Sequence, residues 1–503
     1  MDKLIRLKEI LEKNRAYQHA MTILSWDLET EAPVNAALSI SKTLGALFEL
    51  SYLTLVNDEV RDIVYGVDIN TLNEIDKKLI LNLRKNIFDK MSKIPVDVYS
   101  KYSELGTMST QKWGEAKRTN NLEIYAPYLE EVIKYNKDFI KYRGYEGHPY
   151  NLLLSDYENE LTVEIVDEFF KNIKDELTPF IKEVITKKRE ELKDIKARFL
   201  SKPYPIDKQK ELSKEISEIL KYDYNSGVIK ESEHPFTTST SNKDVRITTH
   251  YYENDPLSAI YSTIHETGHA LYEQQISDEY QDNFLGNGVS MGIHESQSRI
   301  FENMFCKNDS FTKVIYDLLD KYFGVEITLD EFKLLLNEVN TSLIRVEADE
   351  LTYPIHVMIR YELEKEIFSD LEKMENAEEI AKKWADKYEE YLGVSPKTYS
   401  EGILQDVHWS QGSFGYFSSY ALGSAYSAQI YKAMEKDVDI NKDLADSNFE
   451  NINNWLKEKI HKFGSFKDPK DVILNATGEE FNSKYYVDYL KNKFAKIYGV
   501  EVK

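Results

Sequence analysis

Residues 255–271, which read DPLSAIYSTIHETGHAL, decide the fold of this chain. Asp255 is a favourable N-cap and Pro256 suits the first helical position, so a helix is predicted to begin here. Apolar residues then recur at helical spacing and predict one buried face. That face is made by Leu257, Ile260, Ile264, Gly268 and Leu271. The stretch therefore predicts an amphipathic helix that packs against a large core.

The same helix contains the pattern H-E-x-x-H at residues 265–269. His265 and His269 lie four residues apart, so their imidazoles project from one face of the helix. Two imidazoles placed in this way can hold zinc, and Glu266 between them projects towards water on the metal. Random order would give this pattern about 0.03 times in such a chain. The pattern therefore indicates a catalytic metal site on this helix, which is called the zinc helix below. The alternative is an ordinary helix with two histidines.

A catalytic zinc site needs a third protein ligand and an open position for water. An extended pattern with a third histidine fails, because Tyr272 and Gln275 stand at the required glycine and histidine positions. Glu295, in a helix predicted after the loop at residues 286–288, is the predicted third ligand. Glu273 would have to bend back from the zinc helix, and Glu302 is better placed to support a ligand. His294 is the remaining alternative.

Most of the remaining chain also shows helical periodicity, with only 12 prolines and 20 glycines. Apolar residues advance by three or four along residues 163–185, and Thr328 with Glu331 has the pattern of a capping box. Residues 228–252 are the exception, because their Thr, Ser and Val content predicts strands and a turn. We expect a large, mainly α fold with a small β-sheet next to the zinc helix.

Composition narrows the class of protein. The chain has 503 residues, 42% of them hydrophobic, and a formal net charge of −23, which argues against a nucleic-acid partner. Charges interrupt the first ten residues, and no uncharged run approaches membrane-spanning length, so we expect no membrane association and a cytoplasmic location. The single cysteine, Cys306, is expected to be an inert core thiol. We expect one catalytic unit over residues 1–503, with a helical part at 1–202 and a catalytic part at 203–503.

Five motifs follow one another along the chain. They are DVRIT at 244–248, HETGH at 265–269, HESQ at 294–297, IRVEAD at 344–349 and GILQDVHW at 402–409. In this set and order the chain resembles the carboxypeptidase Taq family of metallocarboxypeptidases, over essentially its whole length. The resemblance implies a mainly helical, cleft-bearing fold that is commonly a homodimer. It also implies an enzyme that uses one zinc or cobalt ion to remove single residues from the C-termini of peptides.

Carried over motif by motif, the resemblance implies that His265, His269 and Glu295 hold one divalent metal per chain, with zinc expected first and cobalt second. It implies Glu266 as the general base that activates water. The implied partners are peptides with a free C-terminus and, in a homodimer, a second copy of the chain.

Two further groups are predicted to act on the substrate. Tyr420 and His408 are candidates for stabilising the oxyanion of the reaction, and each has packing or support of the site as its alternative. Asp406, with Gln405, is predicted to orient groups of the substrate-binding site by hydrogen bonds, with capping of a loop as the alternative.

An arginine suits a terminal carboxylate better than a lysine, because its planar fork offers two donors. Arg345 is the predicted anchor. Its alternative is a plain helical ion pair with Asp349, four residues further on. Arg246 is the rival anchor, although it can also simply pair with Asp244.

The sequence as a whole predicts a zinc-dependent carboxypeptidase that acts on unfolded peptides. An oligopeptidase that cuts internal bonds is the first alternative, and it differs in not requiring a free C-terminus. A non-catalytic peptide-binding scaffold is the second alternative, and the intact Glu266 argues against it.

Overall fold

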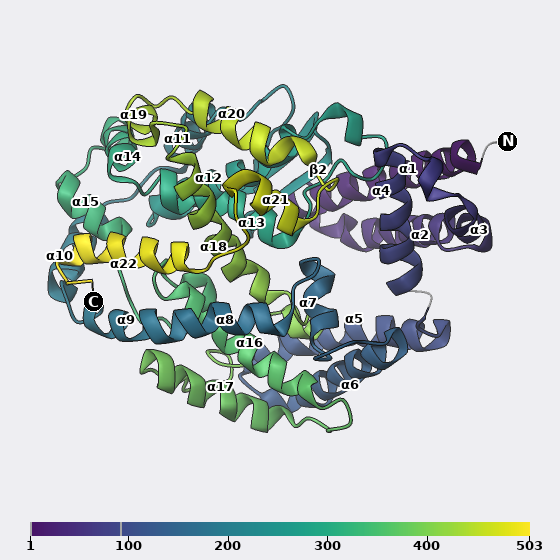
Figure 1. Ribbon diagram of the computed structural model, residues 1–503. Coiled ribbons are helices and arrows are strands. Elements are labelled where there is room, and N and C mark those ends of the chain that lie inside the picture. Colours follow the sequence, from purple (N-terminus) through teal and green to yellow (C-terminus); the bar gives the residue numbers. More distant parts are fainter. Residues whose placement is uncertain (1–2, 91–92, 503) are drawn as a thin grey trace.

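The computed structural model describes residues 3–90 and 93–502, and most of them lie in helices (Figure 1). The helices that precede the sheet are α1 (Lys3–Thr30), α2 (Ala37–Leu55), α3 (Asp58–Gly66), α4 (Glu74–Leu83), α5 (Val96–Thr119), α6 (Ala126–Arg143), α7 (Asn151–Tyr157), α8 (Val163–Asn172), α9 (Thr178–Val184), α10 (Arg189–Phe199) and α11 (Ile206–Ile219). The mainly α class predicted from periodicity is confirmed.

The helices that follow the sheet include the two that carry the HETGH and HESQ motifs. They are α12 (Pro256–Gln274), α13 (Met291–Arg299), α14 (Asp309–Phe323), α15 (Leu329–Leu336), α16 (Tyr353–Ser369), α17 (Ala377–Leu392), α18 (Phe417–Met434), α19 (Ile440–Ala445), α20 (Glu450–Lys459), α21 (Pro469–Thr477) and α22 (Lys484–Tyr498). α18 runs through the middle of the molecule (Figure 1).

A three-stranded sheet lies against α12, as residues 228–252 predicted. Its strands are β1 (Ile229–Glu231), β2 (Thr237–Ser241) and β3 (Asp244–Thr249), in the order β1-β3-β2. β1 runs parallel to β3 and β2 runs antiparallel to it. Val245 and Ile247 of β3 are buried in a small cluster with Ala270 of α12. The sheet therefore packs on the helix that carries the H-E-x-x-H pattern.

The helix starts predicted from capping chemistry are confirmed. The Asp255 side chain accepts hydrogen bonds from the N–H groups of Leu257 and Ser258, and α12 begins at Pro256. Thr328 and Glu331 form the reciprocal capping box at the start of α15. Each cap satisfies N–H groups that the helix itself leaves without a partner.

The helical stretch predicted at residues 163–185 forms as α8 and α9, joined by the π-helical turn Ile173–Leu177. The wide turn does not interrupt the apolar face. All eight predicted positions are buried, namely Val166, Phe169, Phe170, Ile173, Leu177, Phe180, Ile181 and Val184.

The main apolar core draws side chains from residue 116 to residue 498, including Phe199 and Tyr204 on either side of the predicted boundary. Helices α1 to α4 have a smaller core of their own and lie together at one side of the molecule (Figure 1). The division at residues 202–203 stays a prediction. Cys306 is buried, and burial raises the pKa of its thiol. In the described ranges, every helix is too short or too polar to cross a bilayer.

Helix α13 is held close to both α12 and α18 by two glycines. A methyl group on Gly268 of α12 would lie 2.5 Å from the carbonyl oxygen of Gln297. A methyl group on Gly423 of α18 would lie 2.6 Å from both Cβ and Cγ of Glu295. Real side-chain carbons do not approach so closely, so glycine permits this packing. The three helices together place Glu295 above the histidines of α12.

Candidate metal centre and active site

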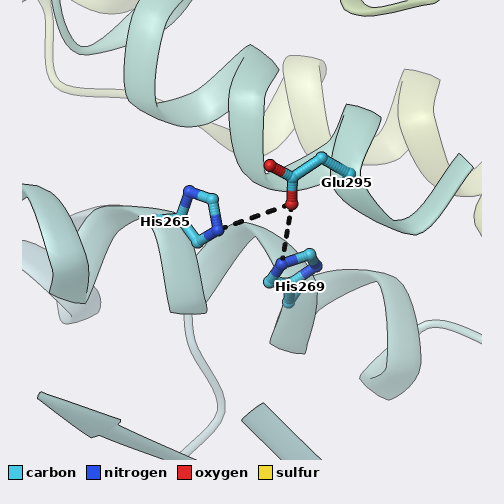
Figure 2. Close-up of side chains that lie close together, drawn as sticks. All are labelled: His265, His269 and Glu295. Atoms are coloured by element: carbon cyan, nitrogen blue, oxygen red, sulfur yellow. Dashed lines mark ion pairs between the residues drawn. The ribbon is translucent and has the colours of Figure 1, made fainter. Parts of the chain in front are cut away.

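Two histidines and one carboxylate converge on a single point. His265 and His269 project from α12, and Glu295 reaches towards them from α13 (Figure 2). The Oε2 atom of Glu295 lies 3.6 Å from Nε2 of His265 and 3.4 Å from Nε2 of His269. One donor atom from each residue lies within 4.8 Å of the others. The structure therefore brings together the three residues predicted as metal ligands.

These separations fit one small metal ion. Ligand atoms about 2.0–2.1 Å from a tetrahedral zinc ion lie about 3.3 Å from one another. The two distances to Glu295 differ from that value by 0.1–0.3 Å. Three protein donors also leave a fourth position for water, as catalytic sites require. The position of Glu295 relative to both imidazoles therefore fits a metal such as zinc.

The outer nitrogen of His265 is fixed by a carboxylate. His265 Nδ1 lies 2.8 Å from Oε2 of Glu302, which also accepts a hydrogen bond from Nη1 of Arg299. Arg299 in turn donates from Nε to Oε1 of Glu295, at 2.7 Å. This network leaves His265 Nε2 facing the metal position. Glu302, an alternative ligand in the sequence, supports His265 and Arg299 in the structure.

The outer nitrogen of His269 begins a chain of hydrogen bonds. His269 Nδ1 lies 2.6 Å from Nδ1 of His294, and His294 Nε2 lies 2.8 Å from Oε1 of Glu273. Glu273 also accepts the backbone N–H of Gly288, where a Cβ atom would meet the His294 ring at 2.5 Å. His294 and Glu273, both alternative ligands in the sequence, thus stand behind His269. Sequence reasoning did not foresee this chain, because its members come from two helices and a loop.

Charge and burial shift the pKa of the carboxylates in the site in opposite directions. Burial lowers the pKa of His269 to about 3. Burial alone would raise the pKa of Glu295, but Arg299 and the two imidazoles hold it well below its usual value. Burial would also raise the pKa of Glu302, but the charges of Arg299 and His265 have the larger effect and lower this pKa to about 2. The site therefore offers a neutral imidazole and ionised carboxylates, the protonation states in which these groups bind metals.

Glu266 lies beside the two histidines and is buried. Its Oε2 atom accepts a hydrogen bond of 2.6 Å from the hydroxyl of Thr237, in β2. Burial raises the pKa of the Glu266 carboxyl. The sheet next to the zinc helix thus fixes the direction of this carboxylate. Sequence reasoning missed Thr237, because no spacing rule connects it to a helix that begins 19 residues later.

A second cluster surrounds Arg345, whose side chain is only 7% exposed. Arg345 donates from Nε and Nη2 to Oδ1 of Asp406, at 3.1 and 2.9 Å, and from Nη1 to the hydroxyl of Tyr353, at 3.3 Å. Its backbone N–H donates to the side chain of Gln405. Asp406 and Gln405 therefore orient Arg345 by hydrogen bonds, and their role in substrate binding stays a prediction.

The alternative prediction of a helical ion pair between Arg345 and Asp349 is wrong. Arg345 lies in the short 3-10 helix Arg345–Glu347, and α16 begins only at Tyr353. The Asp349 carboxylate accepts from the backbone N–H groups of Leu351 and Thr352 and so caps the turn that leads into α16. Asp349 is thus occupied by the backbone, and the partner of Arg345 comes from a segment about 60 residues further along the chain.

Tyr420 and His408 lie together next to Arg345. His408 Nε2 lies 3.3 Å from the Tyr420 hydroxyl, and the Arg345 guanidinium lies 4.9 Å from the centre of the Tyr420 ring. Burial lowers the pKa of His408 to about 4, so this imidazole is neutral at neutral pH. The structure therefore gathers the two oxyanion candidates and the predicted anchor in one place.

Two tyrosines connect this cluster with the metal ligands. The Tyr353 ring lies 4.7 Å from the guanidinium of Arg299, while its hydroxyl accepts from Arg345. Burial raises the pKa of Tyr416, Glu295 raises it further and Arg345 lowers it, so both charged groups act on this hydroxyl. The cluster around Arg345 thus lies next to Arg299, which supports the metal ligand Glu295.

Arg246 is paired elsewhere. It donates to both carboxylate oxygens of Asp244, at 2.7 and 3.0 Å, and lies 5.7 Å from the Trp26 ring. Arg246 therefore makes the ion pair with Asp244 that the sequence analysis gave as the alternative to an anchor role. A role of Arg246 as the anchor stays a prediction.

Comparison with known proteins gives one consistent result. The family model described as carboxypeptidase Taq (M32) metallopeptidase matches residues 6–494. The chain is 40% identical to carboxypeptidase 1 of Bacillus subtilis and 35% identical to thermostable carboxypeptidase 1 of Pyrococcus furiosus, over at least 97% of every chain compared. The crystal structure of M32 carboxypeptidase from Deinococcus radiodurans has a TM-score of 0.92 at 29% identity, over 99% of this chain and 100% of that chain.

The match spans nearly the whole chain, so the similarity is not limited to the zinc helix. The family implies a divalent metal, for which His265, His269 and Glu295 form a candidate site. A non-catalytic scaffold is therefore not supported. The chain belongs to the carboxypeptidase Taq (M32) metallopeptidase family and is a metallocarboxypeptidase, an enzyme that hydrolyses peptides.

Proposed function

We propose that this enzyme releases C-terminal residues one at a time. It would use one divalent metal ion, held by His265, His269 and Glu295, with zinc as the preferred metal and cobalt as the alternative. The observation that carries the proposal is the convergence of these three donors beside the buried Glu266. Imidazole donors favour transition metals over magnesium. A zinc ion held by these residues would supply two things: it would lower the pKa of its water to about 7, and it would polarise the scissile carbonyl.

Glu266 acts as the general base. Its carboxylate takes a proton from the attacking water and delivers it to the nitrogen of the leaving residue. The Thr237 hydroxyl donates a hydrogen bond to Oε2 of Glu266, so that Oε1 is the oxygen that takes the proton. Burial raises the pKa of Glu266, which brings its basicity closer to what the proton transfer requires.

Tyr420 stabilises the oxyanion. His408 Nδ1 is buried and has no hydrogen-bond partner within the described chain, which favours the tautomer that carries its proton on Nε2. In that tautomer His408 donates to the Tyr420 oxygen, 3.3 Å away. The hydroxyl proton of Tyr420, which in the free enzyme is donated to the Tyr416 hydroxyl, then turns to the oxyanion when the substrate binds.

Arg345 binds the terminal carboxylate of the substrate. Its Nε and Nη2 side faces Asp406, and Tyr353 takes one proton of Nη1. One N–H on each terminal nitrogen remains, and together they form a two-donor fork. A carboxylate fits such a fork with two parallel hydrogen bonds. This requirement makes the enzyme an exopeptidase.

Two variants test the metal site and the base separately. Glu266→Gln should keep the metal and lose most of the turnover, while Glu295→Ala should lose metal affinity. Elemental analysis and cleavage of a peptide followed by mass spectrometry measure both. Glu372→Gln, which removes an exposed carboxylate, serves as the matched control. Release of the ion by Glu266→Gln, with normal binding by Glu295→Ala, would reverse the proposed roles.

Amidation of the substrate separates the carboxypeptidase from the oligopeptidase alternative, which the comparisons do not favour. An amidated peptide lacks the carboxylate that Arg345 binds, so it should be cleaved about a hundredfold more slowly than the free acid. Equal cleavage of both peptides would favour the oligopeptidase.

We also propose that the enzyme is a homodimer joined through α2. Three apolar side chains of this helix are largely exposed, namely Leu38 (69%), Phe48 (59%) and Leu53 (55%). Lys42 and Glu49 are its only charged residues. A second copy of the same surface would cover these side chains.

Light scattering tests the dimer. The wild type should have twice the mass of the chain and Phe48→Glu should be a monomer, whereas Met374→Glu, which changes an exposed side chain elsewhere, should not alter the mass. A monomeric wild type would contradict the proposal. The cytoplasmic location stays a prediction.

A further inference from the structure

Asp406 is shared by two arginines. Arg345 donates to the Oδ1 atom of Asp406. Arg360 of α16 donates to the Oδ2 atom, from Nε at 2.7 Å and from Nη2 at 2.6 Å. The Phe417 ring lies near both guanidinium groups, 5.5 Å from that of Arg345 and 5.3 Å from that of Arg360. Asp406 is thus the centre of a buried cluster of three charged groups.

Arg360 has no donor left for a substrate. Its side chain is fully buried and stacks on Trp384, with the guanidinium 4.4 Å from the ring centre. Nη1 donates to the carbonyl of His356 and to the hydroxyl of Tyr388, and Nη2 donates to Gln405 as well as to Asp406. Every N–H of Arg360 is therefore used within the protein, whereas Arg345 keeps two.

The cluster carries one surplus positive charge. Two guanidinium groups and one carboxylate sum to +1. Burial lowers the pKa of both His408 and His356, so these neighbours add no charge at neutral pH. With Asp406 alone, Arg345 would instead be part of a neutral pair. A surplus charge in a buried place favours an anionic ligand, because the surroundings screen it poorly.

We propose that Arg360 is the positioning residue that sets the preference for a free C-terminal carboxylate. It offsets the charge of Asp406, so that Asp406 can hold Arg345 in place without cancelling its attraction for the substrate. Arg360 acts through Asp406 and Arg345 and does not touch the peptide. The inference rests on the proposed role of Arg345 as the anchor.

The experiment compares a peptide that ends in a free carboxylate with the same peptide amidated, using the metal-loaded enzyme. Arg360→Met removes the charge and keeps an apolar side chain of similar length. It should raise KM for the free acid by about tenfold or more, with kcat nearly unchanged, and leave the amide unaffected. Equal effects on acid and amide would show a purely structural role and overturn the inference.

A second variant keeps the test decisive if Arg360→Met does not fold. Arg360→Lys retains the positive charge and loses the planar fork, so it should preserve most of the wild-type preference for acid over amide. Loss of that preference in folded Arg360→Lys would overturn the inference, because the charge would then not be the cause. The double variant Arg360→Met with Asp406→Asn restores the net charge of +1 and should recover part of the preference.

Arg345→Met separates this inference from the proposed function. If Arg345→Met keeps the acid preference, the anchor itself is wrong. If Arg345→Met loses the preference and Arg360→Met retains it, the anchor stands and only the role of Arg360 fails.

Discussion

Replacing Gly423 by alanine should damage the metal site through packing alone. The added methyl group would lie 2.6 Å from Cβ and Cγ of Glu295, whereas carbon atoms in contact are normally about 3.5–4.0 Å apart. Glu295 or its helix must therefore move by about 1 Å. Overpacking costs about 1–3 kcal/mol, and alanine returns about 1 kcal/mol through its higher helix propensity. The free energy of unfolding should fall by about 0–2 kcal/mol.

The effect on function should be much larger than the effect on stability. A displacement of about 1 Å at a catalytic site can cost about a hundredfold in rate, and a disturbed ligand shell about tenfold or more in metal affinity. Competition with a chelator measures the affinity, and urea denaturation measures the stability. Gly106→Ala is the control, because nothing lies within 4 Å of its added methyl group. It should gain about 0.5–1 kcal/mol with unchanged turnover. Wild-type metal affinity in Gly423→Ala would refute this reasoning.

Three further changes have definite expected outcomes. Glu302→Gln should weaken metal binding by about 10- to 100-fold in a chelator competition, because His265 loses its charged partner; unchanged affinity would contradict that role. Thr328→Ala should lower the free energy of unfolding in urea by about 1 kcal/mol without affecting activity, since it removes only a helix cap. Burial raises the pKa of Glu158 from 4.5 to about 7, so the folded state binds more protons than the unfolded state between these values. Stability from this group is therefore present below pH 4.5 and falls as the pH rises to 7, by about 2.5 × 1.36 ≈ 3 kcal/mol. Glu158→Gln should lack this decline in unfolding curves recorded at pH 5 and pH 8.

The features that the sequence predicted correctly depend on residues close together in the chain. The Asp255 cap, the capping box at Thr328 and the projection of His265 and His269 from one face all follow from helical spacing. The choice of Glu295 required one further step, the expectation of a second helix after a glycine-containing loop. The ion pair of Arg299 with Glu295 could have been predicted by the same spacing rules, because Arg299 lies one helical turn after Glu295.

The features that the sequence did not predict depend on distant segments. The pairing of Arg345 with Asp349 assumed a continuous helix, but α16 starts only at Tyr353 and Asp349 is used as a cap. Arg360 carries no motif, and its pairing with Asp406 joins residues 46 positions apart. Spacing rules describe which face a side chain occupies. They do not say which face of another element it will meet.

The close packing of α13 against α18 also bears on the order of events during folding. The hydroxyl of Ser427 in α18 donates to the carbonyl of Ser296, 131 residues earlier, next to the close contact of Gly423 with Glu295. The helices with the metal ligands are neighbours in the chain, but the surface that positions Glu295 is remote from them. Closing so long a loop is slow compared with forming a helix. We therefore expect the histidine pair to be in place as soon as α12 forms, and the complete three-ligand site to arise only when the C-terminal part of the chain has docked.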